Sequence, residues 1–246
     1  MTDVVEYLIR ISPAFVLVAL LYGLLRGPKA LPLRIMLVIL GFLVIRDTMV
    51  VFGYWHYGVT SNWIPWLRFI EDPLLVACFA VGSLLMTAVL VVVEREGRKL
   101  LVWGKPKLSH LAWGVAGGIA IALPLLAAYR LVPLADRGGA LPTAMIGPML
   151  LVAAFGNLTE DVLMRGYVQG YLATLYSPLR AALGCAMFYA AGHLFLVTTV
   201  TDLGLPILVL ALYDGLVCAL VRMKSGIIPA AISHGVAICV LGLGLL

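Results

Sequence analysis

The chain has 246 residues, of which 63% are hydrophobic and only 12% are charged. Its mean hydropathy is +1.09, whereas an ordinary soluble domain is about 45–50% apolar and about 25% charged. These values exclude a soluble globular fold, and they exclude a disordered chain because disorder requires low hydrophobicity. They predict an all-α fold, a polytopic transmembrane helical bundle.

Eight apolar segments are candidates to cross the bilayer, whose core of about 30 Å takes roughly 20 helical residues. The predicted spans are 13–25, 33–53, 74–93, 111–129, 144–165, 179–197, 205–221 and 226–246. The fifth is expected to continue as a helix to about Tyr176. Prolines lie at or near five predicted starts, where a missing backbone N–H costs least: Pro13, Pro32, Pro73, Pro178 and Pro206.

Basic residues are distributed unevenly between alternate connections. One set carries eleven: Arg26, Lys29, Arg34, Arg95, Arg98, Lys99, Lys105, Lys107, Arg180, Arg222 and Lys224. The other set, with the N-terminal tail, carries four: Arg10, Arg68, Arg130 and Arg137. The positive-inside rule then predicts an even number of spans with both termini outside the cytoplasm. The net charge of +5 is thereby explained by topology, and no nucleic-acid partner is expected.

Two other groups of residues have simple structural interpretations. The loop after the second span, with Trp55, Tyr57, Trp63 and Trp66, is typical of an interfacial aromatic belt. The four cysteines lie within apolar runs without a CxxC pair, which predicts neither a disulfide framework nor a cysteine-based zinc site. The first residues lack a cleavage site before the first apolar run, so no cleaved signal peptide is expected.

The two halves of the chain differ in their polar content. Residues 1–143 are predicted to form plain apolar helices without a diagnostic motif, apart from Arg46 and Asp47. Residues 144–246 place a series of polar groups at membrane depth: Asn157, Glu160, Asp161, Arg165, Tyr189, His193, Asp214, Ser233 and His234. An ionisable residue in the bilayer costs at least about 2.5–3.5 kcal/mol, so each is a candidate functional residue.

Helical spacing sorts the polar residues of the fifth span. Asp161 and Arg165 are four residues apart and can pair. Glu160 points away from Arg165, which leaves its carboxylate free for a role other than pairing with that arginine. Asn157 lies on the same helical face as Glu160. Because interhelical polar pairs gain only about 0.6 kcal/mol on average, the combination of Glu160 with two histidines favours a functional site over simple helix association.

The remaining ionisable residues receive weaker interpretations. Arg46 and Asp47 are adjacent and do not face each other on a helix, so each is expected to find a partner elsewhere in a structural role. For Asp214 a structural and a functional role stay equally open. Asp161 and Arg165 are expected to orient other groups rather than to react.

A carboxylate and an imidazole can act as general base and acid on water, and a second imidazole can donate to an oxyanion. Serine or cysteine nucleophile chemistry is poorly supported, since no GxSxG is present and no cysteine shares a helical face with His193. Glu160, His193 and His234 could also form a catalytic zinc set. Because HExxH is absent, zinc is the minority interpretation, and no cofactor is expected.

These residues resemble the CPBP family of CAAX proteases and bacteriocin-processing enzymes, also called Abi. The family's first motif, EExxxR followed by Gly, is similar to residues 160–166, with Asp161 in place of the second Glu. Its second motif, FxxxH, is similar to residues 189–193, which end at His193 and have Tyr189 in place of Phe. Its third, HxxxN, begins at His234 but has Ile238 at the Asn position. The resemblance covers roughly residues 144–246, a CPBP-like catalytic core, and implies a glutamic-type intramembrane endopeptidase.

The resemblance implies a role for each matching residue. Glu160 and His193 would activate water to attack a peptide carbonyl, and His234 would help to stabilise the oxyanion. Arg165 would hold the carboxylate arrangement through Asp161. Ile238 cannot donate a hydrogen bond, and loss of one oxyanion donor costs about 10²–10³ in rate.

Asn157 is a candidate to supply the missing donor, because it shares the helical face of Glu160. The implied substrate is a membrane-associated protein or peptide, cut near its C-terminal or leader segment, and the implied location is a bacterial cytoplasmic membrane. Two alternatives remain open. One is a non-catalytic peptide-binding or immunity protein, which Ile238 favours. The other is a transporter, which the absence of an inverted repeat disfavours.

Overall fold

The computed structural model describes residues 2–201 and 203–244 and is mostly helical. Within these residues, seven helical segments are long and apolar enough to cross a membrane, and a shorter apolar helix covers Ile227–Leu243. The predicted helical membrane bundle of about eight spans is thereby confirmed, with one small β-hairpin added. Large apolar side chains such as Leu20, Leu85 and Val92 are exposed on the outside of the bundle, where lipid would cover them.

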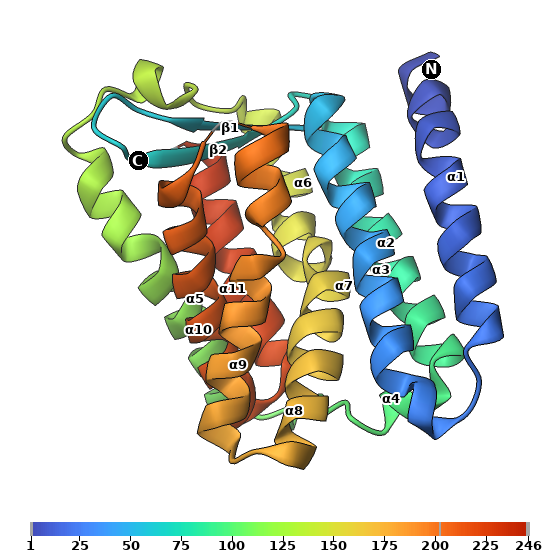
Figure 1. The fold of residues 1–246 in the computed structure, drawn as a ribbon. Coiled ribbons are helices and arrows are strands. Elements are labelled where there is room, and N and C mark those ends of the chain that lie inside the picture. The colour runs from blue at the N-terminus through green and yellow to red at the C-terminus, as the bar shows by residue number, and fades with distance from the viewer. Residues whose placement is uncertain (1, 202, 245–246) are drawn as a thin grey trace.

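The helices follow one another up and down the bundle (Figure 1). In the first half they are α1 (Thr2–Leu24), α2 (Leu31–Val51), α3 (Pro73–Val93), α4 (Arg95–Arg98) and α5 (Leu108–Tyr129). In the second half they are α6 (Ile146–Leu151), α7 (Leu158–Asp161), α8 (Gln169–Leu175), α9 (Pro178–Ala191), α10 (Leu205–Ser225) and α11 (Ile227–Leu243). Short 3₁₀ turns cover Pro28–Ala30, Leu134–Arg137 and Thr143–Met145.

Four of the five prolines lie in the first turn of a helix, as predicted: Pro32, Pro73, Pro178 and Pro206. The prediction for Pro13 was wrong, because this residue lies inside α1. The turns before Pro13 already pack against α2, where Ile11 is buried and the Tyr7 hydroxyl donates to the Ile45 carbonyl at 3.0 Å. This packing extends α1 beyond the missing backbone hydrogen bond.

The fifth span is a long and irregular helix that runs from Thr143 to Leu175. It ends close to the predicted Tyr176. Two π-helical stretches, Val152–Gly156 and Val162–Val168, flank the short α7. Such stretches frequently mark functional sites, and here they surround the segment that carries Glu160.

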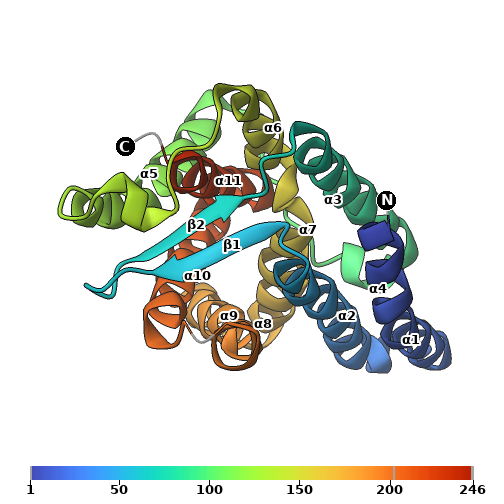
Figure 2. The same cartoon turned by 90° about the horizontal axis from the view of Figure 1, so that it is seen from above.

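The loop after α2 folds into an antiparallel hairpin of β1 (Trp55–Val59) and β2 (Pro65–Phe69), with Trp55 opposite Phe69. Figure 2 shows the hairpin lying across one end of the bundle. Trp63 at the turn is 72% exposed, whereas Trp55 is buried. The expectation of a simple aromatic belt was therefore incomplete, since the hairpin also packs on the helices below it.

Small residues let the helices around the second half approach closely. Gly114 and Gly118 of α5 face α11, and a Cβ added to either would touch that helix. Gly235 of α11 lies against the backbone carbonyl of Ala153. Close backbone approach at small residues is the usual basis of helix association in membranes, and it fixes α11 beside the irregular fifth span.

A buried ion pair joins the other end of the bundle. Arg34 of α2 donates to both carboxylate oxygens of Glu94, at 2.8 and 2.9 Å, and the Tyr22 hydroxyl donates to the same carboxylate at 2.7 Å. Burial raises the pKa of Glu94, but the hydrogen bonds from Arg34 and Tyr22 outweigh it and lower the pKa below its usual value. The contact ties α1 and α2 to the loop after α3.

Candidate active site

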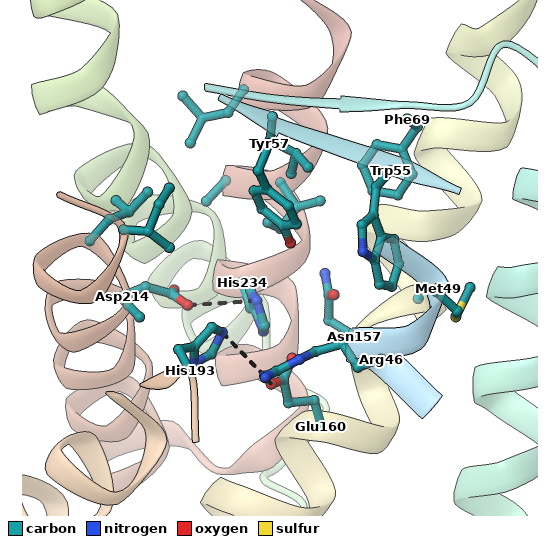
Figure 3. Close-up of a pocket in the computed structure, with 18 of the residues that line it drawn as sticks. Arg46, Met49, Trp55, Tyr57, Phe69, Asn157, Glu160, His193, Asp214 and His234 are labelled. Atoms are coloured by element: carbon teal, nitrogen blue, oxygen red, sulfur yellow. Dashed lines mark hydrogen bonds and ion pairs between the residues drawn. The ribbon is translucent and has the colours of Figure 1, made fainter. Parts of the chain in front are cut away.

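A cavity of about 210 Å³ lies beneath the hairpin, among α2, α7, α9, α10 and α11 (Figure 3). Its lining includes four of the six residues to which the sequence assigned a role at the site: Asn157, Glu160, His193 and His234. They come from three helical segments, so the structure brings together the groups that spacing alone could assign only to separate spans. Most of the remaining lining is apolar.

Glu160 is 6% exposed, and its Oε1 lies 3.2 Å from Nη1 of Arg46 in α2. The same nitrogen lies 3.3 Å from Nε2 of His193. Glu160 therefore does not pair with Arg165, as expected, but its carboxylate has a partner that the sequence did not predict, Arg46. One guanidinium nitrogen bridges the carboxylate and the imidazole, as Figure 3 shows.

Arg46 is held in place by two further hydrogen bonds. Its Nε donates to Asp47 Oδ1 at 2.8 Å, and its Nη2 donates to the Gly192 carbonyl at 2.7 Å. The expectation that Arg46 and Asp47 would not meet was wrong, because the long arginine side chain bends back to the carboxylate of its neighbour. Arg46 also lines the cavity.

His193 lies just beyond the end of α9, where the regular helix stops at Ala191. Its Nδ1 is 2.9 Å from the Tyr189 carbonyl, which can only accept a hydrogen bond. This contact assigns the ring proton to Nδ1 and leaves the lone pair on Nε2, which accepts from Arg46. The unprotonated nitrogen therefore faces the Glu160 side of the cavity.

His234 is buried between two carboxylates. Its Nδ1 lies 3.1 Å from Asp161 Oδ2, and its Nε2 lies 3.6 Å from Asp214 Oδ2. The Tyr189 hydroxyl donates to the same Asp214 oxygen at 3.0 Å. Because carboxylate oxygens accept hydrogen bonds, both ring nitrogens of His234 are suited to donate.

Asp161 and Arg165 form the predicted i,i+4 ion pair, with Nε 3.3 Å from Oδ1. Both side chains are fully buried. The Arg165 guanidinium carbon also lies 4.1 Å from the centre of the Tyr189 ring, in cation–π geometry. Asp161 thus links Arg165 to His234 and holds these side chains in a fixed arrangement.

Asn157 lines the same cavity, and its Nδ2 is buried without a hydrogen-bond partner in the part of the chain that the structure describes. Figure 3 shows the Asn157 amide between Tyr57 and Arg46. A buried amide without an acceptor loses hydrogen-bond energy. An arriving carbonyl or oxyanion would supply that acceptor.

Ile238 also lines the cavity, but it packs with the apolar cluster beneath the hairpin that includes Trp55, Phe69 and Val76. This environment suits a branched apolar side chain. The structure therefore offers no donor at the position where the CPBP motif has Asn, and it explains the isoleucine by packing against the hairpin.

The sequence left the contributions of Arg46, Asp214 and Tyr57 to this cavity unassigned. Tyr57 of β1 lines the cavity, and burial raises the pKa of its phenol to about 12, so it stays protonated and able to donate. For Arg46 and Asp214, the sequence signal was the free-energy cost of placing an ionisable side chain at membrane depth. For Tyr57, which the sequence placed in an anchoring loop, no such signal existed.

The three residues of the zinc interpretation do not fit a metal site. Within residues 2–201 and 203–244, no group of three or more His, Cys, Asp or Glu side chains is arranged to hold a metal ion. His193 Nε2 faces the Arg46 cation instead, and both nitrogens of His234 face carboxylates.

The helices and the cavity define the class of protein: a multi-pass membrane protein with carboxylate and imidazole groups lining a cavity inside the bundle. Residues 142–240 match the family model described as type II CAAX prenyl endopeptidase Rce1-like. This segment is an Rce1-like CAAX endopeptidase domain of the CPBP family, which is a family of peptide hydrolases. Neither a curated protein nor a solved structure matches the chain.

Proposed function

We propose that the protein is an intramembrane endopeptidase that cuts a peptide bond in the C-terminal or leader segment of a membrane-associated protein. The Rce1-like family indicates a CAAX-type intramembrane protease. One observation carries the proposal further: Glu160 Oε1 and His193 Nε2 both lie within 3.3 Å of a single atom, Arg46 Nη1. Both groups therefore lie beside one point of the cavity, and in this proposal they act on one water molecule there.

In the proposed reaction Glu160 takes a proton from this water while the water oxygen bonds to the scissile carbonyl carbon. The π electrons of the carbonyl move to its oxygen and form a tetrahedral oxyanion. His193, with its lone pair on Nε2, orients the water. The oxyanion then reforms the carbonyl, the C–N bond breaks, and the proton on Glu160 passes to the departing amine.

His234 and Asn157 are the proposed donors on the oxyanion side of the cavity. The contact of His234 Nδ1 with Asp161 fixes the ring, so Nε2, 3.6 Å from Asp214 Oδ2, is the nitrogen proposed to donate. The Asn157 amide nitrogen has no other acceptor in the described residues. Asp161 and Arg165 are positioning residues, because their ion pair orients His234. Donors held ready at the site of developing charge lower the barrier without reorganisation.

The test is hydrolysis of a fluorescence-quenched peptide by the purified protein in liposomes. The peptide ends in a CAAX sequence and is used with and without a farnesyl group. We expect Glu160→Gln and His193→Ala to lower turnover by about 10²–10⁴-fold, the range of general acid–base catalysis. Glu6→Gln, on an exposed side chain of α1, is the matched control and should keep the wild-type rate.

A second candidate function is peptide binding without hydrolysis, which Ile238 favours because it removes a donor from the third motif. The same liposomes distinguish the two functions. Wild-type protein that binds the labelled peptide but releases no fragment would support the binding function. Unchanged hydrolysis by both Glu160→Gln and His193→Ala would contradict the proposed catalytic assignment.

We further propose that the protein lies in a bacterial cytoplasmic membrane with both termini outside the cytoplasm. Two observations support this orientation. The start of α1 and the end of α11 lie at the same end of the bundle, and the basic segment around α4 lies at the opposite end (Figure 1). Clustered Lys and Arg at one end of a bundle favour its cytoplasmic placement.

A further inference from the structure

The guanidinium group of Arg46 lies at the point of the cavity where the reaction is proposed to occur. Its Nη1 is within 3.3 Å of both Glu160 Oε1 and His193 Nε2. A carbonyl carbon attacked by water from these two groups must come within a few ångströms of this nitrogen. Arg46 belongs to α2, outside the segment that matches the Rce1-like family.

The way Arg46 is paired distinguishes it from a structural arginine. Arg34 directs Nε and Nη2 to the two oxygens of one carboxylate, Glu94, and its Nη1 donates only to backbone carbonyls of the neighbouring turn. Arg46 instead spreads its donors over Asp47, the Gly192 carbonyl, Glu160 and His193. The contacts with Asp47 and Gly192 fix the guanidinium group, and Nη1 is directed at the two groups proposed to handle protons.

The cavity also lacks a donor that its family motif would provide. Ile238 presents only carbon atoms, and Nδ1 of His234 is engaged by Asp161. The guanidinium group of Arg46 can take the place of this donor, because it is held in a fixed position and the residue is only 6% exposed. Hydrogen bonds from an ionised donor are about twice as strong as those from a neutral donor.

We infer that Arg46 is a further catalytic residue, which donates from Nη1 to the oxyanion of the tetrahedral intermediate. The inference rests on the proposed function. When Glu160 accepts the proton of water, its carboxylate becomes neutral and its attraction for Arg46 falls. The negative charge moves to the former carbonyl oxygen, and the Nη1–H group turns to it. Arg46 keeps its own protons, and its contact returns to Glu160 once the amine has taken the proton.

The inference is tested with Arg46→Gln and Arg46→Lys in the liposome assay, with kcat and KM measured across pH. We expect Arg46→Gln to lower kcat by about 10²–10³-fold at every pH with little change in KM, as for loss of one oxyanion donor. Arg46→Lys should keep part of the rate, because it keeps the charge but not the planar fork. Arg180→Gln, at an exposed position of α9, is the matched control.

Chemical rescue separates a reacting group from a merely structural one. Millimolar guanidinium chloride should restore part of the turnover of Arg46→Ala and leave the wild-type rate unchanged. A wild-type rate in Arg46→Gln would overturn the inference while the proposed function stands. A defect that disappears at alkaline pH would also overturn it, because Arg46 would then act only on the ionisation of Glu160. Absence of hydrolysis by the wild-type protein would overturn the proposed function, and this inference with it.

Discussion

The side-chain amide of Asn157 is the residue-scale feature that most directly tests the proposed oxyanion site. Its buried Nδ2 has no partner among the described residues and lies in the lining that Glu160 and His234 share. We predict that Asn157→Ala lowers kcat by about 10²–10³-fold with little change in KM, because a donor that acts in the transition state is lost. Peptide hydrolysis in liposomes measures both constants.

Asn62→Ala provides the control for this substitution, because Asn62 is exposed in the turn of the hairpin, away from the cavity lining. Its hydrolysis should equal that of the wild-type protein. Undiminished hydrolysis by Asn157→Ala would remove Asn157 from the oxyanion site and leave His234 and Arg46 as the proposed donors.

Residue-scale contacts could be predicted only where they are local. The pairing of Asp161 with Arg165 follows from a fixed helical spacing, and the structure confirms it. The contact of Arg46 with Glu160 joins residues 114 positions apart and depends on how α2 packs beside α7. No periodicity encodes that distance, so the sequence indicated the cost of burying Arg46 but not its partner.

At the scale of elements, the place of His234 depends on how closely α11 approaches the fifth span. Gly235 faces the Ala153 carbonyl in the π-helical stretch, and an added Cβ would collide with that backbone atom. We predict that Gly235→Ala destabilises the protein by about 1–3 kcal/mol, as overpacking does. We expect it also to lower turnover, because the helix that carries His234 must shift.

Thermal unfolding in detergent and hydrolysis in liposomes measure the two effects of Gly235→Ala. The matched control is Gly23→Ala in α1, where an added Cβ meets nothing within 4 Å. This control should unfold at the wild-type temperature or slightly above it, because alanine favours a helix over glycine. A Gly235→Ala variant with normal stability and turnover would show that the contact is not needed to hold His234.

The elements were predictable to different degrees. Long apolar runs and prolines in first turns located most spans, because length and a missing N–H are local properties. The hairpin was not predicted, since its short strands carry the same aromatic residues that anchor loops at a membrane surface. Its identity depends on the pairing of Trp55 with Phe69 and on the helices beneath it.

For the whole molecule, the unequal distribution of basic residues predicts orientation as well as number of spans. The bundle places the loop around α4 at one end and the hairpin at the other (Figure 1). Moving Lys and Arg across a membrane is unfavourable, so the loop that carries Arg95, Arg98 and Lys99 should stay in the cytoplasm. The hairpin, which covers the cavity, should then lie on the outer side.

Cysteine labelling tests this orientation. Ser61 in the hairpin turn and Lys105 in the loop before α5 are both exposed, and each is replaced singly by Cys in a Cys78→Ala background, since Cys78 is the exposed native thiol. A maleimide that cannot cross membranes should label Ser61→Cys in intact cells, and Lys105→Cys only after permeabilisation. The reverse pattern would contradict the orientation, and it would move the hairpin side of the cavity to the cytoplasm, where a newly made C-terminal segment is first available.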